Sequence, residues 1–397
     1  MTSIGNNTFS KCSDLMQVVI PSSVTSIGDY IFSKCISLSQ ISFECPSNLT
    51  SIGNNSFYGC YSLSQIAIPS PVASIGCFSF YGCSSLTQIA IPSSVTSIGN
   101  YAFNGCSSLV QITFENHSLL TSISDYAFAG CSSLAQIAIP SAVASIGNHA
   151  FVKCSLLKAI TIPSSVNSIK NNAFHECSSL AQVTFETQSS LASIGYNSFG
   201  GCKLITQITI PSSVTSIGNY TFSGCSSLAQ IAFESQSSLA SIGNNAFSDC
   251  SLITQITIPS SVSSIGNYAF SGCSSLTQIS FETPSSLNFI GNYAFAKCHS
   301  LINITIPSFV TSIGNNSFSE CASLKEISFE SPSSLTSIKY SSFAGCKSLK
   351  QVTIPKSVAS IGENSFHGCT SLAKISLPSQ INQKCLGLSP KVIINTI

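Results

Sequence analysis

Charge is scarce in this chain. Only 7% of its 397 residues are charged, the formal net charge is +1, and every one of the fifteen basic residues is a lysine. Such a sparse and balanced charge gives no long-range attraction to a polyanion. Without arginine, the chain also lacks the planar donor that best recognises phosphate groups and guanine edges. The composition therefore argues against a nucleic-acid partner.

Long apolar runs are also missing. No stretch reaches the roughly 18 residues that a membrane-spanning helix needs. The opening MTSIGNNTFS has neither the basic start nor the apolar core of a secretory signal, so the sequence predicts no membrane span and leaves the localisation open. Apolar residues still make up 44% of the chain. That fraction is too high for a disordered protein, and we expect the chain to fold.

Motifs for catalysis and metal binding are absent as well. The chain contains no glycine-rich phosphate loop, no paired-carboxylate cleft and no CxxC pair. Its histidines belong to no Ser/His/Asp or Cys/His group, and we expect them to decorate the surface: His117, His149, His175, His299 and His367. The sequence therefore predicts a protein that is not an enzyme and needs no cofactor or metal.

The chain does contain one sequence repeat, which occurs sixteen times. The isoleucine of a Ser-Ile-Gly-like triplet recurs at a spacing of 23 or 25 residues, phenylalanine follows five residues later, and cysteine three residues after that. The sixteen isoleucines are Ile4, Ile27, Ile52, Ile75, Ile98, Ile123, Ile146, Ile169, Ile194, Ile217, Ile242, Ile265, Ile290, Ile313, Ile338 and Ile361. A fixed period of this length predicts a repeat architecture.

Each repeat reads as one coil. Alternating apolar residues around 228–233 predict a short strand, the Ser-Ile triplet predicts a shorter one, and NYTFSGC at 219–225 predicts one helical or 3₁₀ turn capped by Asn219. A single coil buries too few side chains to fold alone, so neighbouring coils must stack and pair in parallel. We expect an α/β-type repeat solenoid of sixteen coils over residues 1–378, followed by a cap or last strand at 379–397.

The pattern CxxLxxIxIPxxVxxIGxxAF, found at 83–103 and, with Ile253 in place of the leucine, at 250–270, resembles the BspA-type leucine-rich repeat. The resemblance covers nearly the whole chain. It implies a surface or secreted antigen that binds a protein or glycan on another cell or on a matrix. Because the first coil begins without the Leu, Ile and Pro that should precede Ile4, we expect a truncated gene product or a piece of a longer protein.

Nineteen cysteines are present, and sixteen of them, from Cys12 to Cys369, form one column. Stacked strands lie about 4.8 Å apart, and in-register Cβ atoms then stay farther apart than the ~3.8 Å of a disulfide. We therefore expect buried free thiols that fill the core. Cys45, Cys77 and Cys385 lie off the column and are better candidates for reactive or paired thiols, with their redox state left open.

Glutamine precedes the strand isoleucine in twelve coils and so predicts a row of amides on one face. Two interpretations stay open: a ladder of amides bonded to one another, or a flat polar surface that binds protein or glycan. The candidate binding residues are Gln88, Gln111, Gln136, Gln182, Gln207, Gln230, Gln255 and Gln278. Specificity along the row is expected where other residues replace glutamine, at Ala159, Asn303, Glu326 and Lys374.

The two extra residues of each 25-residue coil fall in the loop after the strand, which begins with a glutamate: Glu44, Glu115, Glu186, Glu234, Glu282 or Glu330. No two of these glutamates lie in successive coils. We expect a solvated row of carboxylates, and we add Glu186, Glu234, Glu282 and Glu330 to the candidate binding residues because insertions in repeat proteins often mark the binding edge.

Two functions of different classes fit these observations. The first is multivalent binding, in which a long ligand meets many similar weak sites and gains avidity, as in cell-surface adhesion or host interaction. The alternative is a structural or antigenic repeat scaffold with no dedicated ligand. The sequence leaves the ligand and the oligomeric state open.

Overall fold

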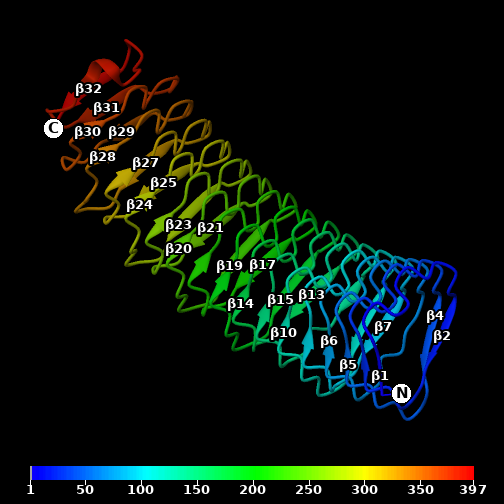
Figure 1. Ribbon diagram of the computed structural model, residues 1–397. Helices are drawn as coiled ribbons and strands as arrows, with labels where there is room; N and C mark the ends of the chain where they lie inside the picture. The colour runs from blue at the N-terminus through cyan, green and yellow to red at the C-terminus, as the bar shows by residue number, and fades with distance from the viewer. Residues whose placement is uncertain (1) are drawn as a thin grey trace. The chain divides into compact units, whose positions relative to one another are not determined.

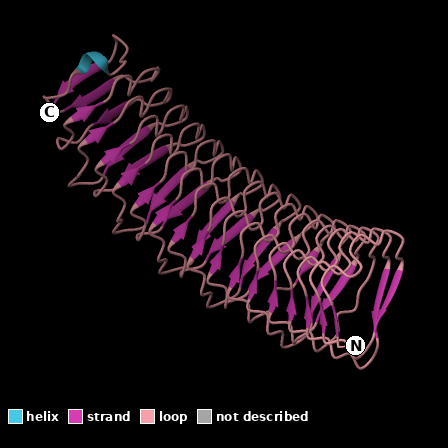
Figure 2. Cartoon of the chain, in the orientation of Figure 1, coloured by secondary structure: helices cyan, strands magenta, loops and turns pink. Residues whose placement is uncertain are grey.

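The computed structural model describes residues 2–397, which form coils of short strands joined by turns. The chain divides into two compact units: unit 1 runs to Leu191 and includes Ser198–Cys202, and unit 2 holds Ala192–Asn197 and Lys203–Ile397. Within each unit, successive coils lie side by side (Figure 1), and almost all the regular structure is strand (Figure 2). The predicted parallel-sheet solenoid is confirmed, whereas a single domain over 1–378 stays a prediction.

One row of strands, the serine–isoleucine row, contributes two residues per coil. In unit 1 it comprises β1 (Ser3–Ile4), β3 (Ser26–Ile27), β5 (Ser51–Ile52), β6 (Ser74–Ile75), β8 (Ser97–Ile98), β10 (Ser122–Ile123), β12 (Ser145–Ile146) and β14 (Ser168–Ile169). In unit 2 it comprises β16 (Ser193–Ile194), β18 (Ser216–Ile217), β20 (Ser241–Ile242), β22 (Ser264–Ile265), β24 (Phe289–Ile290), β26 (Ser312–Ile313), β28 (Ser337–Ile338) and β30 (Ser360–Ile361). Every adjacent pair from β16 to β30 is parallel and in register.

The second row, the glutamine row, has strands of two to four residues. In unit 1 it comprises β2 (Gln17–Ile20), β4 (Gln40–Phe43), β7 (Gln88–Ile91), β9 (Gln111–Phe114), β11 (Gln136–Ile137), β13 (Ala159–Ile162) and β15 (Gln182–Phe185). In unit 2 it comprises β17 (Gln207–Ile210), β19 (Gln230–Phe233), β21 (Gln255–Ile258), β23 (Gln278–Phe281), β25 (Asn303–Ile306), β27 (Glu326–Phe329), β29 (Gln351–Thr353) and β31 (Lys374–Leu377). This row is paired at some steps and open at others.

Columns of identical side chains fill the core between the rows. The phenylalanines from Phe9 to Phe199 stack face to face in unit 1 with ring centroids 5.1–5.5 Å apart, and those from Phe222 to Phe366 stack in unit 2 at 5.3–5.6 Å. Such separations lie within the range that aromatic pairs prefer. Each coil therefore completes the hydrophobic core of its neighbour.

The phenylalanine segments are turns and not helices, which differs from the helical or 3₁₀ turn that the sequence predicts. In the coil around Phe222, Tyr220 and Gly224 adopt left-handed backbone with φ of 60° and 70°. Two left-handed residues four positions apart interrupt any right-handed helix. Within residues 2–397 the one helix is η1 (Gln383–Cys385), of 3₁₀ type.

The tail after residue 378 adds a last strand. β32 (Ile393–Thr396) pairs in parallel with β31 in full register. Ahead of it, the backbone N–H of Phe366 donates to the carbonyl of Leu386 at 3.0 Å, and the Leu386 side chain is fully buried. The tail thus covers the end of unit 2.

Candidate functional site

The predicted binding glutamines all lie where the sequence puts them, at the first position of a strand. Each is exposed, and the isoleucine or valine that follows it is buried. The alternation follows from the period-2 geometry of a strand. The glutamine row therefore presents its amides to solvent; their role in binding stays a prediction.

The amide ladder, one of the two interpretations left open above, does not form. Within residues 2–397, Gln182 is the one glutamine of the row whose side chain donates a hydrogen bond inside the protein, and its acceptor is Thr184 Oγ1 in the same strand, 3.4 Å away. No glutamine amide bonds the next. The exposed amides consequently keep their donors and acceptors for water or a ligand.

Pairing in the glutamine row depends on how each strand ends. Strands that end in Phe-Glu pair fully with the preceding strand, which ends in Ile-Pro, as β9 does with β7. The glutamate N–H extends the ladder by donating to the isoleucine carbonyl at 3.0 Å. The six bonds run from Glu44 to Ile20, Glu115 to Ile91, Glu186 to Ile162, Glu234 to Ile210, Glu282 to Ile258, and Glu330 to Ile306.

The opposite step, from a Phe-Glu strand to an Ile-Pro strand, is weak. Proline has no N–H to donate at the position where glutamate bonds the preceding coil. Gln40 and Gln65 accordingly form an isolated bridge, and β23 and β25 pair through one residue each. Neither β19 with β21 nor β27 with β29 forms a ladder. The glutamine row therefore does not form a flat, continuous face.

Grooves lie at these weak steps. In unit 1 a groove of about 900 Å³ runs across four coils, from β4 over residues 65–71 and β7 to β9. Its lining combines exposed amides with apolar side chains, and it includes Gln40, Gln65, Gln88, Ile66 and Pro69. Cys45 borders it as an exposed free thiol. A smaller groove of about 370 Å³ lies between β9 and β11.

Unit 2 has its own groove of about 620 Å³ between β27 and β29. Two of its lining residues, Glu326 and Lys374, are among the four that replace glutamine in the row, and Lys356 adds another charge. The expected place for specificity thus coincides with a concave site. The other two replacements, Ala159 and Asn303, begin β13 and β25.

The predicted binding glutamates form hydrogen bonds between neighbouring coils. The Oε2 atom of each accepts a hydrogen bond from a serine backbone N–H that lies 22 residues earlier, just after the proline of the preceding coil. These bonds are 2.9–3.0 Å long and join Glu44 to Ser22, Glu115 to Ser93, Glu186 to Ser164, Glu234 to Ser212, Glu282 to Ser260, and Glu330 to Ser308. Charge-assisted bonds of this kind tie each long loop to its neighbour.

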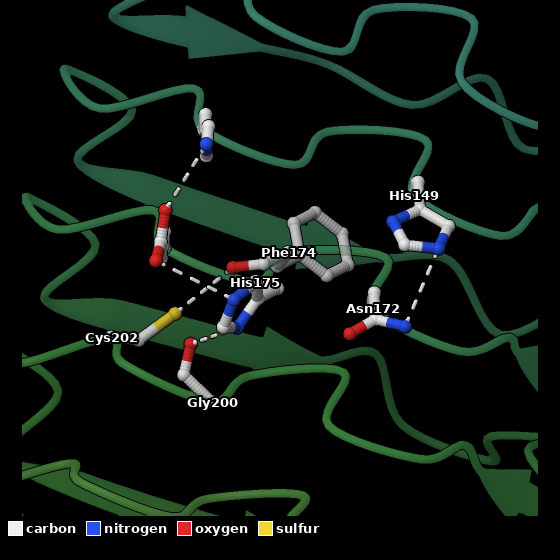
Figure 3. Close-up of polar contacts among 8 residues, drawn as sticks. His149, Asn172, Phe174, His175, Gly200 and Cys202 are labelled. Carbon is white, nitrogen blue, oxygen red and sulfur yellow. Dashed lines mark hydrogen bonds and ion pairs between the residues drawn. The ribbon is translucent and has the colours of Figure 1, made fainter.

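The column cysteines are free and, apart from Cys12, buried. Fourteen of the buried thiols donate to the carbonyl of the phenylalanine one coil earlier, as Cys202 Sγ does to Phe174 O at 3.1 Å (Figure 3). Burial raises the pKa of Cys131, Cys177 and Cys321 to about 12. The expected buried thiols are confirmed. Cys45, Cys77 and Cys385 are also free, and each is at least partly exposed.

Two histidines support the turns. His149 stacks on Tyr126 with centroids 4.4 Å apart and lies 3.4 Å from Asn172 Nδ2, while His175 Nδ1 lies 2.9 Å from the carbonyl of Gly200 (Figure 3). Burial lowers the pKa of His149 below its ordinary value, and the nearby His175 lowers it further. These contacts give both side chains a packing role within unit 1.

An asparagine ladder, which the sequence interpretation missed, joins the coils at the residue after the Ser-Ile-Gly triplet. The side-chain Oδ1 accepts from the backbone N–H of the next coil, as in Asn244 N to Asn219 Oδ1 at 2.7 Å. Asn219 is therefore not a helix cap. An asparagine that recurs at one fixed position of the repeat could have indicated this ladder, since stacked asparagines commonly form hydrogen bonds along the stack.

Two further observations concern metal binding and membrane-spanning helices. In the described part of the chain, residues 2–397, no group of three or more His, Cys, Asp or Glu side chains could hold a metal ion. Over the same residues, no helix has the length and apolar character to cross a membrane.

The comparisons agree with this geometry. The family model "BspA type Leucine rich repeat region (6 copies)" matches residues 2–119, 73–206, 117–229, 192–325 and 288–386. A leucine-rich repeat protein from Bacteroides ovatus is 28% identical with a TM-score of 0.68, over 100% of this chain and 88% of that one. A leucine-rich cell surface protein from Faecalibacterium prausnitzii is 26% identical with a TM-score of 0.41, over 96% and 87%. Among curated proteins, none matches.

Proposed function

The chain belongs to the BspA-type leucine-rich repeat family, and from that premise we propose that it binds protein ligands through the grooves of its glutamine row. The observation that carries the proposal is the coincidence of unbonded amides with concave sites. Glutamine amides that neither bond each other nor pack inward line a groove of about 900 Å³ in unit 1. Concave sites with apolar walls and a few polar groups are where ligands bind most often.

The groove suits an extended polypeptide segment. Its apolar lining, including Ile66 and Pro69, would cover ligand side chains, and the amides of Gln65, Gln88 and Gln111 would bond the ligand backbone. Similar grooves of smaller size recur in unit 1 and unit 2. Repetition favours a multivalent ligand, because linked weak sites add avidity without a single strong one. Adhesion to another cell or to a matrix is the finer form of this proposal.

The experiment compares two triple variants of the full chain on immobilised laminin, collagen and basement-membrane extract. Gln65→Lys/Gln88→Lys/Gln111→Lys places three charges in the unit 1 groove. Gln207→Lys/Gln230→Lys/Gln255→Lys places the same charges on β17, β19 and β21, where Gln207 and Gln230 are paired in register. We expect saturable binding by the unchanged chain, about tenfold weaker binding by the first variant, and a smaller loss for the second.

Cys45 offers an independent measurement, since its exposed thiol borders the groove. Alkylation of Cys45, followed by peptide mass spectrometry, should slow when a ligand occupies the groove, while Cys385 reacts at an unchanged rate. If both triple variants bind like the unchanged chain and Cys45 is never protected, the groove is not the site. If no protein on the panel shows saturable binding, the alternative of a structural or antigenic scaffold is favoured.

A further inference from the structure

A pocket lined only by tyrosines and asparagines lies in unit 2, apart from the glutamine row. It measures about 360 Å³ and crosses four successive coils. Its walls are Tyr268, Tyr293 and Tyr340, and asparagines contribute the remaining lining. No charged side chain faces it. A ligand that fits must therefore be neutral and must offer both polar groups and an apolar face.

The tyrosine rings of this pocket reach solvent. Tyr268 and Tyr293 stack with centroids 4.6 Å apart and planes within 4°. Tyr268 and Tyr340 are 39% and 48% exposed. The face of an aromatic ring is the negative end of its quadrupole. Such a face attracts the weakly positive C–H groups that line one side of a pyranose ring.

A row of fixed donors lies beside the tyrosines. The Oδ1 atoms of Asn267, Asn292 and Asn315 accept backbone N–H groups of the following coil at 2.7, 2.7 and 3.1 Å. Each amide is thereby held in one orientation. The three Nδ2 groups form no hydrogen bond within residues 2–397. Three donors at the spacing of the coils suit the hydroxyl groups of a saccharide chain.

One departure from the coil pattern lies at the pocket. Tyr340 stands where asparagine continues the ladder, and its side chain supplies no such acceptor to the next coil. The ladder of asparagine side chains therefore ends at this wall of the pocket.

We propose that this pocket binds a neutral saccharide, with one sugar ring against its exposed tyrosine side chains and hydroxyl groups on the asparagine amides. Its volume is at the lower end of the range for small-ligand sites, which suits one or two sugar rings. Because backbone bonds fix the asparagines and stacking fixes Tyr293, little conformational entropy is lost on binding. The pocket shares no residue with the grooves of the glutamine row.

The test is retention of the full chain on an array that carries chitotetraose, mannotetraose and N-acetyllactosamine beside their sulfated counterparts. Tyr293→Asn and Tyr340→Asn remove two of the three tyrosine walls. Both variants introduce the residue that other coils carry in these slots, so the coils should still fold. The matched control is Tyr30→Asn, which changes an exposed tyrosine of the Tyr293 slot in unit 1, outside the pocket.

We expect retention by at least one neutral glycan, about tenfold weaker binding for each pocket variant and an unchanged affinity for the control. Retention by sulfated glycans alone, retention by no neutral glycan, or equal retention of both pocket variants would overturn the proposal. The lysine substitutions in the glutamine row should leave glycan retention unchanged, so the two proposals can fail separately.

Discussion

The two rows of unit 2 follow the same chain through the same coils and yet differ in continuity. The serine–isoleucine row pairs at every step from β16 to β30, while the glutamine row has no ladder between β19 and β21 or between β27 and β29. In the continuous row, the residue after the isoleucine donates to the preceding isoleucine carbonyl, as Gly243 does to Ile217 at 2.9 Å. In the interrupted row, proline occupies the corresponding place in alternate coils.

The difference teaches that one backbone N–H per coil weakens or strengthens a row, depending on the neighbour that it faces. A β-ladder tolerates proline at an edge, because its missing donor then faces nothing that needs it. Where an Ile-Pro strand follows a Phe-Glu strand within a unit, the ladder is absent or shrinks to one or two residue pairs, whereas β31 pairs with β29 although both precede a proline. The core columns hold the coils together across these steps, so the row opens without unfolding the unit.

The largest expected effect on stability comes from ionising the column of protonated thiols, which both rows share. Burial raises the pKa of Cys131, Cys177 and Cys321 to about 12, while thiols of the unfolded chain titrate near 9. Between these values the folded chain binds more protons, so stability falls as pH rises from 9 to 12, by about 1.4 kcal/mol per thiol for each pH unit. Urea midpoints from circular dichroism at pH 8, 9 and 10 measure the loss.

The matched variant is Cys131→Ala/Cys177→Ala, in which the slope of stability against pH should decrease by the share of two thiols. A urea midpoint that stays constant from pH 8 to pH 10 would contradict the expectation.

A smaller loss of stability should follow when a proline, which lacks a backbone N–H, is introduced into the continuous serine–isoleucine row. The N–H of Ala240 donates to the carbonyl of Thr215 at 2.8 Å, next to the pair of β18 and β20. Ala240→Pro removes that donor and should lower the free energy of unfolding by about 1 kcal/mol or somewhat more. Ala240→Thr, which keeps the N–H and matches Thr215 in the preceding coil, is the control. Equal urea midpoints for the two variants would show that continuity of this row is dispensable.

The smallest change in stability is expected for the reverse exchange, Pro355→Ala, which restores a donor at the groove between β27 and β29. A new hydrogen bond of about 1 kcal/mol is offset by the greater freedom of the unfolded chain without proline, which costs about as much. The informative measurement is hydrogen exchange, because residues 352–355 should gain protection as β29 pairs with β27. Pro378→Ala is the control, since β29 and β31 already pair. Unaltered exchange at 352–355 would show that the missing N–H is not the cause of the groove.

Much of the fold could be predicted from the sequence because its signals are local and repeated. The phenylalanine and cysteine columns, both strand rows and the exposed glutamines follow from the 23- and 25-residue spacing and from alternation of apolar residues. The turns were expected to be helical because Asn219 resembles a cap. Their left-handed residues, such as Tyr220, could not be foreseen, since tyrosine seldom adopts that backbone.

The grooves and the glutamate bonds were harder to predict for a different reason. The alternation of Ile-Pro and Phe-Glu is visible in the sequence, but its effect depends on which neighbour each strand faces. Likewise, nothing in the sequence shows that Glu234 reaches the backbone of Ser212 in the preceding coil, because that contact depends on the path of the longer loop. Properties of single coils were predictable, whereas properties of the steps between coils were not.

The burial of the thiol column affects how readily the protein is oxidised in an oxidising environment. Fifteen thiols are buried, fourteen of them donate to a phenylalanine carbonyl, and oxidation requires the thiolate. A peroxide or a disulfide exchange catalyst would find only Cys12, Cys45, Cys77 and Cys385 within reach. A chain so rich in cysteine can therefore persist outside a reducing compartment without being cross-linked at random, and its shelf life in air should be set by those four side chains.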